Sequence, residues 1–171
     1  MIRLEPLTST HQLERFRSGN SAVDAYLIRD ALREQNEERT RVFVVVDTEE
    51  NSSRPVGYFA LSLTGYYVPI LDENRTPQEE ENFVNLVELT FLARDLTRRG
   101  QGLGDFLLVE ALERVAQISR CAGGPGVILR TTKEGLALYE RFDFLWINRS
   151  ENYLFLPISD VRRIVTPDSN S

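Results

Sequence analysis

Three glycines within five positions, Gly100, Gly102 and Gly104, are the feature of this chain most typical of a binding site. Apolar residues at helical spacing follow directly, from 106 to 118. Glycine lets the backbone turn sharply and leaves its N–H groups uncovered, and the first turn of a helix presents more N–H groups without partners inside the helix. This combination predicts a phosphate-binding loop at a helix start, although a tight connection between a strand and a helix would use the same glycines.

The spacing of the glycines separates this loop from two common nucleotide-binding motifs. It does not match the G-x-G-x-x-G of dinucleotide-binding folds, and no Lys-Ser or Lys-Thr pair follows as in nucleoside triphosphatases. The loop therefore predicts another kind of phosphate-containing ligand.

The composition limits the class of protein. The 171 residues, 42% of them hydrophobic, predict one compact domain over 1–165 and a flexible tail over 166–171. The formal net charge of −6 disfavours a protein whose main affinity is for nucleic-acid phosphates. A single cysteine, with neither an 18-residue apolar run nor a signal-type start, predicts a cytoplasmic protein that does not associate with membranes. The His, Cys and carboxylate residues do not stand at the spacing of metal ligands, so no metal site is expected.

The pattern of apolar residues predicts the elements that position the loop. A continuous β-branched run at 42–46 indicates a central strand, and Ser21 with Asp24 indicates the start of a helix. The acidic stretch from Tyr66 to Asn82 is expected to be an exposed excursion between strands. The expected strands are 2–7, 42–46, 56–63, 84–93, 127–129, 144–147 and 153–156, and the expected helices are 21–34, 106–118 and 133–142. This order indicates an α/β fold in which helices cover a mixed sheet.

Several passages resemble the GNAT superfamily of acyl-CoA-dependent N-acetyltransferases. Residues 99–104, Arg-Gly-Gln-Gly-Leu-Gly, resemble its Arg/Gln-x-x-Gly-x-Gly loop. Residues 137–144 are similar to its A-x-x-F-Y-x-x-x-G-F segment, with Asp143 in place of the usual glycine. Residues 16–27 (FRSGNSAVDAYL) and 56–62 (VGYFALS) resemble a GNAT subgroup that includes the acetyltransferase toxins of bacterial toxin–antitoxin pairs.

The resemblance implies a GNAT-like α/β fold, a mixed and mainly antiparallel sheet flanked by helices on both faces. It implies acetyl-CoA as the acyl donor and direct attack of an amine on the thioester. In the family, backbone groups of the strand before the loop bind the pantetheine arm, and the loop amides hold the pyrophosphate. The cofactor-binding residues expected on this ground are Leu92, Ala93, Arg94, Arg99, Gly100, Gln101, Gly102, Leu103 and Gly104.

Two side chains are candidates for the proton transfers of acetyl transfer. The resemblance places Tyr139 beside the thioester sulfur, where its phenol can protonate the departing thiolate, although its spacing alone also fits a tyrosine of the core. Glu88 lies on the strand face that includes Thr90, Leu92 and Arg94. It could accept the proton of the amine, directly or through water, or be a solvated strand residue.

Two other reactive residues are not expected to take part. His11 lies in a polar N-terminal stretch and is expected to be exposed. Cys121 has no nearby His or basic cluster in the sequence to activate it, which argues against an acyl-cysteine intermediate.

Three functions are consistent with these residues. The first is an N-acetyltransferase that modifies a small amine or a peptide. The acidic residues between 72 and 81 would attract such a substrate. The second is a toxin that acetylates aminoacyl-tRNA and is neutralised by an antitoxin partner, with tRNA disfavoured by the acidic charge. The third is a non-catalytic acyl-CoA-binding module. Residues 144–156 could also form the sheet edge of a homodimer.

Overall fold

The computed structural model describes residues 1–166, except for the side chains of 51 and 52, and divides into two compact units. The first unit comprises Met1–Ser62 and Thr90–Ala111, and the second comprises Leu63–Leu89 and Leu112–Ser171. Strands β3 (Asn51–Leu71) and β4 (Pro77–Arg94) and helix α3 (Leu103–Ala122) contribute to both units. Apart from Thr166, the predicted tail over 166–171 lies outside the described residues.

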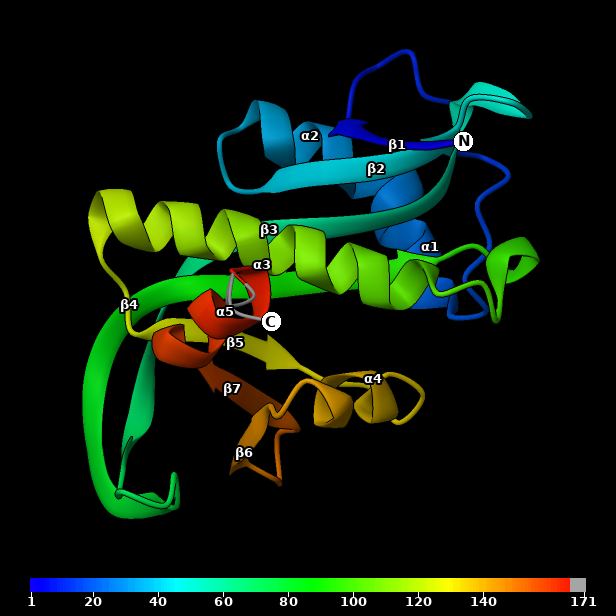
Figure 1. The fold of residues 1–171 in the computed structure, drawn as a ribbon. Helices are drawn as coiled ribbons and strands as arrows, with labels where there is room; N and C mark the ends of the chain where they lie inside the picture. Colours follow the sequence, from blue (N-terminus) through cyan, green and yellow to red (C-terminus); the bar gives the residue numbers. More distant parts are fainter. Residues whose placement is uncertain (167–171) are drawn as a thin grey trace. The chain divides into compact units, whose positions relative to one another are not determined.

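The described strands form a seven-stranded mixed sheet in the order β1-β2-β3-β4-β5-β7-β6 (Figure 1). The other strands are β1 (Ile2–Pro6), β2 (Arg41–Asp47), β5 (Gly126–Arg130), β6 (Leu145–Asn148) and β7 (Tyr153–Pro157). The pairs β1–β2, β2–β3, β5–β7 and β6–β7 are antiparallel, whereas β4 and β5 run parallel. The predicted mixed and mainly antiparallel α/β sheet is confirmed.

The helical segment after β1 contains a π-helical turn where the sequence predicts one regular helix. Its parts are α1 (Ser21–Ala25), η1 (Tyr26–Asp30) and α2 (Ala31–Asn36). The helix begins at Ser21, as predicted, but its N-cap is Asn20, whose side-chain oxygen accepts hydrogen bonds from Ala22 N and Val23 N. Asp24 accepts hydrogen bonds from the backbone and the hydroxyl of Ser18 instead, which fixes the loop before the helix.

In the first unit, β3 separates two layers of side chains. Tyr58 lies in a core cluster with Leu27 of η1 and Val44 of β2. Gly57 approaches α3, since a Cβ atom added there would lie 3.0 Å from Leu107 Cδ1. Because neighbouring residues of a strand point to opposite faces, helices cover both faces of this part of the sheet, as predicted (Figure 1).

In the second unit, a long hairpin replaces the excursion predicted over 66–82. Strand β3 continues to Leu71 and β4 begins at Pro77, so the turn comprises only residues 72–76. Asp72 Oδ1 holds this turn by accepting hydrogen bonds from two of its backbone N–H groups. The prediction was wrong because the polar start of β4 is a strand through its pairing with β3, and apolar content does not mark such a strand.

One core cluster of the second unit lies among β3, β4, β5 and β7. Its buried members are Val68, Leu86, Ile128 and Phe155. Gly126 must be glycine because an added Cβ would lie 2.2 Å from Leu156 O on the neighbouring strand β7. Strand β6 ends the sheet beyond β7, so the segment predicted as a dimer edge does lie at an edge.

Two helices follow the strands of the second unit. Helix α4 (Leu136–Arg141) is shorter than the predicted 133–142, and α5 (Ile158–Val165) was not predicted. The buried carboxylate of Asp160 in α5 contacts Arg75 Nη2 at 2.6 Å and Arg163 Nη2 at 2.8 Å. This ion pair ties the hairpin turn to α5.

Two absences hold for the described part of the chain. None of its helices has the length and apolar content needed to cross a membrane. It also contains no group of three or more His, Cys, Asp or Glu side chains that could hold a metal ion.

A methyl group at position 57 tests the packing of α3 on β3. We expect Gly57→Ala to lower the free energy of unfolding by about 1–3 kcal/mol, because the added Cβ is forced against Leu107. Urea denaturation followed by circular dichroism measures this change. An unchanged midpoint would show that α3 does not pack against β3 at this residue.

Candidate functional site

The buried carboxylate of Asp95 anchors the loop that carries the glycines. Asp95, the residue after β4, is 2% exposed. Its oxygens accept hydrogen bonds from Thr97 Oγ1 (2.7 Å), Thr97 N (3.0 Å) and Arg17 N (3.0 Å), and Arg54 Nη2 lies 3.6 Å away. Its own backbone N–H donates to Val56 O at 2.8 Å. Asp95 therefore joins the loop to β3 and to the segment that precedes α1.

The surroundings of Asp95 keep it ionised at neutral pH. Burial by itself would raise the pKa of this carboxyl. Hydrogen bonds from Thr97 and from the Arg17 backbone, with the charge of Arg54, nevertheless hold the pKa below its usual value. The resulting stabilisation is present above the unfolded-state pKa of about 3.9 and is lost as the pH falls through the folded-state pKa.

The motif over 16–27 builds the segment that receives Asp95. Phe16 is fully buried, and Arg17 O accepts a hydrogen bond of 2.8 Å from Leu96 N. Gly19 has a φ of +95°, which favours glycine, and a Cβ there would lie 3.4 Å from Leu96 Cδ2. These residues hold the N-terminal segment against the start of the glycine loop.

Two glycines of the loop adopt the left-handed backbone conformation that side chains disfavour. The φ angles of Gly100 and Gly102 are +75° and +73°, and a Cβ at either position would meet no atom within 4 Å. Gly102 O accepts the hydrogen bond from Phe106 N, so Gly102, which has no side chain, stands at the start of α3. The positive end of the helix dipole lies at this end of α3 and favours an anion there.

The other predicted residues of the loop have distinct positions. Gln101 is exposed, and its side-chain amide donates to Thr97 O at 3.4 Å. Leu103 is buried and packs toward Gly57 of β3, which fixes the first turn of α3. Gly104 is partly buried in that turn.

The two arginines before the glycines differ in their contacts. Arg98 ends the short 3-10 helix η2 (Leu96–Arg98), and its Nη2 lies 2.8 Å from Asp47 Oδ2 and 2.7 Å from Glu50 Oε2. The side chain of Arg99 is exposed and makes no hydrogen bond or ion pair with any residue that the structure describes. Arg98 is therefore used within the protein, whereas the guanidinium of Arg99 is available to an anion.

The predicted pantetheine-binding residues form the end of β4. Leu92 and Arg94 are partly exposed, and Ala93 is buried in the core cluster of the first unit. Among the described residues, the parallel pairing of β4 with β5 ends at Glu88↔Ile128, four residues before Leu92. Backbone groups beyond this pairing can bind a ligand.

The first candidate for proton transfer, Glu88, lies in the second unit. Its side chain is partly buried and has no hydrogen-bond or ion-pair partner among the residues described. Burial raises the pKa of its carboxyl, which brings it closer to that of an effective general base. The partial burial and the unpartnered carboxylate of Glu88 are compatible with a general base, and this role stays a prediction.

The second candidate, Tyr139, lies in α4 of the second unit and is 7% exposed. Its ring packs edge-on against Phe144, with 5.5 Å between centroids, and Gly135 leaves room for it because a Cβ there would lie 3.3 Å from Tyr139 Cε2. Burial raises the pKa of the phenol, so Tyr139 keeps its proton at neutral pH and can act as an acid. Its position beside a thioester stays a prediction.

His11 is buried, which contradicts the expected exposure. Its Nε2 lies 2.8 Å from Glu5 Oε1, and its Nδ1 accepts a hydrogen bond of 3.0 Å from Thr8 N. A polar sequence context does not predict exposure here because these contacts with Glu5 and Thr8 bury the ring. Cys121 is exposed with a free thiol.

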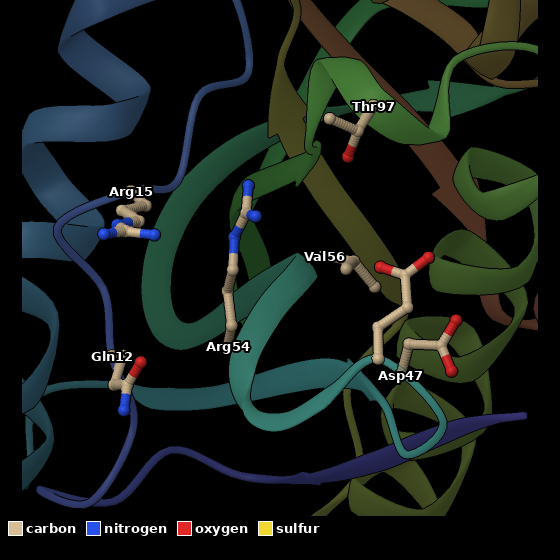
Figure 2. Close-up of a pocket in the computed structure, with 7 residues that line it drawn as sticks. Gln12, Arg15, Asp47, Arg54, Val56 and Thr97 are labelled. Atoms are coloured by element: carbon tan, nitrogen blue, oxygen red, sulfur yellow. The ribbon is translucent and has the colours of Figure 1, made fainter.

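A polar cavity of about 220 Å³ lies in the first unit and includes part of the loop (Figure 2). The residues that line it are Gln12, Arg15, Asp47, Glu50, Arg54, Val56 and Thr97. Neither this cavity nor the role of Asp95 was predicted from the sequence. A signal for Asp95 was present, because Asp-x-Thr at the end of a strand is typical of a turn capped by its own side chain.

Known proteins resemble this chain in sequence and in structure. No family model matches the chain. The "Probable toxin TacT" of Sinorhizobium fredii is 24% identical over 172 residues, which cover 95% of this chain and 94% of that protein. The "tRNA-acetylating toxin" of Mycobacterium tuberculosis is 28% identical over 151 residues, 88% of each chain.

Solved structures of low sequence identity share the fold. The structure of AtaTR bound with acetyl-CoA has a TM-score of 0.82 and 22% identity, and the match covers 96% of this chain and 98% of that one. AtaT complexed with acetyl-methionyl-tRNAfMet has a TM-score of 0.83 and 21% identity, with 97% and 100% covered.

The sheet, the glycine loop at the start of α3 and the similarity to these solved structures show that the chain has the predicted GNAT-like fold. The two relatives carry the names of toxins, which is the subgroup that the motifs over 16–27 and 56–62 resemble. Both relatives agree with the predicted family and enzyme class.

Removal of the charge of Asp95 tests its role as an anchor. We expect Asp95→Asn to lower the free energy of unfolding at neutral pH by about 1–3 kcal/mol, because three donors lose a charged acceptor. The difference from the wild type should shrink as the pH falls from the unfolded-state pKa of about 3.9 through the lower folded-state pKa, where the wild-type carboxylate becomes protonated.

Urea denaturation at a series of pH values measures this dependence. Glu14→Gln is the matched control, since Glu14 is exposed and its carboxylate has no partner among the described residues. A destabilisation by Asp95→Asn that is the same at all pH values would contradict a role for the charge.

Proposed function

We propose that this chain transfers the acetyl group of acetyl-CoA to the amino group of an aminoacyl-tRNA. The observation that carries the proposal is the similarity over most of the chain to a tRNA-acetylating toxin and to AtaT, which was solved with acetyl-methionyl-tRNAfMet. In that molecule the acetyl group is carried by the amino acid on the tRNA. This proposal replaces the small amine or peptide that the acidic residues favoured as acceptor.

The net charge of −6 led to the prediction that tRNA is disfavoured as a substrate. The complex of AtaT with acetyl-methionyl-tRNAfMet argues against that prediction. The physical reason is that the charges are unevenly distributed along this chain. Six acidic residues lie between Leu63 and Leu89, against the single basic residue Arg75. In the first unit, Arg15, Arg17 and Arg99 are exposed and form no ion pair with described residues. Phosphates respond to such local charges, so an overall acidic chain can still bind tRNA.

The glycine loop fits the diphosphate of acetyl-CoA, the donor with which related structures were solved. A Cβ at Gly100 or Gly102 would meet no atom within 4 Å, which leaves room for a phosphate. The proposed donors to its oxygens are the first-turn amides of α3 and the guanidinium of Arg99. The backbone of residues 92–94 is proposed to bind the pantetheine arm. Bound acetyl-CoA supplies a thioester that an amine can attack directly.

Tyr139 and Glu88 are proposed to move the protons of this transfer. Tyr139, whose phenol stays protonated because burial raises its pKa, donates a proton to the leaving sulfur. Glu88, whose pKa burial raises, accepts the proton of the amine directly or through water. Solved structures of AtaT and KacT include variants in which one tyrosine is replaced by phenylalanine, which agrees with a tyrosine of special interest in these toxins.

We also infer an antitoxin as the protein partner. AtaT has been solved with the C-terminus of the antitoxin AtaR, and KacTA has been solved on DNA. By this similarity, a partner protein binds the chain and suppresses its activity. A tRNA substrate also agrees with the predicted cytoplasmic location.

Transfer of radiolabelled acetyl groups from acetyl-CoA to a panel of aminoacyl-tRNAs tests the proposal. We expect label on charged tRNA and none on uncharged tRNA. Tyr139→Phe should lower kcat by about 10²–10⁴-fold, the usual contribution of a general acid, and leave the dissociation constant of acetyl-CoA unchanged. Calorimetry measures that constant.

Tyr153→Phe is the matched control, because Tyr153 is partly buried in the same unit and its ring packs against Tyr66. Label on small amines or peptides, with none on charged tRNA, would contradict the proposed acceptor. Saturable binding of acetyl-CoA without transfer to any acceptor would instead indicate a non-catalytic acyl-CoA-binding module.

A further inference from the structure

Two arginines, Arg15 and Arg54, line the polar cavity of the first unit. The two carboxylates of the lining form their ion pairs with another arginine, Arg98. Figure 2 shows Arg54 in its centre, with Gln12 and Arg15 on one side and Asp47 on the other. Asp47 and Glu50, the two carboxylates of the lining, both contact Nη2 of Arg98, at 2.8 and 2.7 Å. The acidic side of the cavity is therefore already paired within the protein.

Both arginines have guanidinium N–H groups without a hydrogen-bond acceptor among the described residues, although Arg54 forms an ion pair with Asp95. Arg54 Nε is buried and has no hydrogen-bond partner in the described part of the chain, and Arg54 Nη2 lies 3.6 Å from Asp95 Oδ2, beyond hydrogen-bonding distance. Arg15 is exposed and makes no hydrogen bond or ion pair with a described residue. A buried N–H of a charged group requires an acceptor. The cavity thus offers donors of two guanidinium groups to a ligand.

We propose that this cavity binds a phosphate group, at a site distinct from the backbone amides of residues 100–104. The planar fork of a guanidinium matches pairs of phosphate oxygens, and two such forks suit a group with more than one negative charge. The amide of Gln12 and the hydroxyl of Thr97 add neutral groups to the lining. Thr97 Oγ1 also donates to Asp95, which places the cavity next to the anchor of the loop.

Two molecules of the proposed reaction carry phosphate, namely the tRNA backbone and the coenzyme. The assignment of the phosphate to one of these sources rests on the proposed function, whereas the site itself rests on Arg15, Arg54 and the cavity. The experiment therefore begins with inorganic phosphate and then compares the two larger molecules.

The Nε–Hε resonance of Arg54 reports phosphate binding directly. We expect it to shift and saturate when inorganic phosphate is added, and its identity follows from its loss in Arg54→Lys. Arg15→Gln should weaken phosphate binding about tenfold, as expected for the loss of a charge-assisted contact. Arg29→Gln is the matched control, because Arg29 is an exposed arginine of η1 outside the cavity without a partner among the described residues.

A resonance that does not shift with phosphate, or that shifts equally with sodium chloride at the same ionic strength, would overturn the site. If tRNA is the source, Arg15→Gln should weaken tRNA binding and lower the salt dependence of log Kd by about one unit, with acetyl-CoA binding unchanged. If the coenzyme is the source, Arg15→Gln should weaken acetyl-CoA binding alone.

Either of these two results supports the site. Equal effects of Arg15→Gln and Arg29→Gln on both molecules would overturn it. Failure of the wild type to acetylate any tRNA would contradict the proposed function, and the phosphate titration would still decide on the cavity.

Discussion

The buried charge of Asp95 is the constraint on which the candidate binding loop depends. It holds Thr97 in the turn before the glycines, Arg17 in the N-terminal segment and Arg54 in β3. A charge buried without partners is costly, so the three segments cannot separate without losing the contacts that stabilise it. The turn that leads to Gly100 and Gly102 is therefore fixed, and both glycines adopt the left-handed backbone conformation just before α3.

The pairing of charges explains how an acidic chain can present sites for anions. Arg98 is bound by Asp47 and Glu50, and Arg75 is bound by Asp160. Six of the 26 acidic residues lie between Leu63 and Leu89, in the second unit, and precede the glycine loop in the sequence. What remains in the first unit is a set of arginines without carboxylate partners among the described residues, Arg15, Arg17 and Arg99. Their positions are more informative about ligands than the sum of charges.

Local signals made part of the fold and of the site predictable from the sequence. The β-branched run of β2 and the glycines before α3 act through their own backbone preferences, so both were identified without knowledge of their neighbours. The role of Asp95 depends on Arg17, 78 positions away, and the burial of His11 depends on Glu5. The acidic start of β4 is a strand through its pairing with β3. Such long-range contacts leave no periodic pattern in the sequence, and Tyr139 was selected only through a family resemblance.

The central claim is that the backbone N–H groups of residues 100–104 bind the diphosphate of acetyl-CoA. Its most direct test is the ¹H–¹⁵N spectrum of the protein titrated with acetyl-CoA and, separately, with pantetheine, which has no phosphate. We predict large saturable shifts of the amides of Gly100, Gly102 and Gly104 with acetyl-CoA and none with pantetheine. Glycine amides that do not move at saturating acetyl-CoA, or that move equally with pantetheine, would contradict the claim.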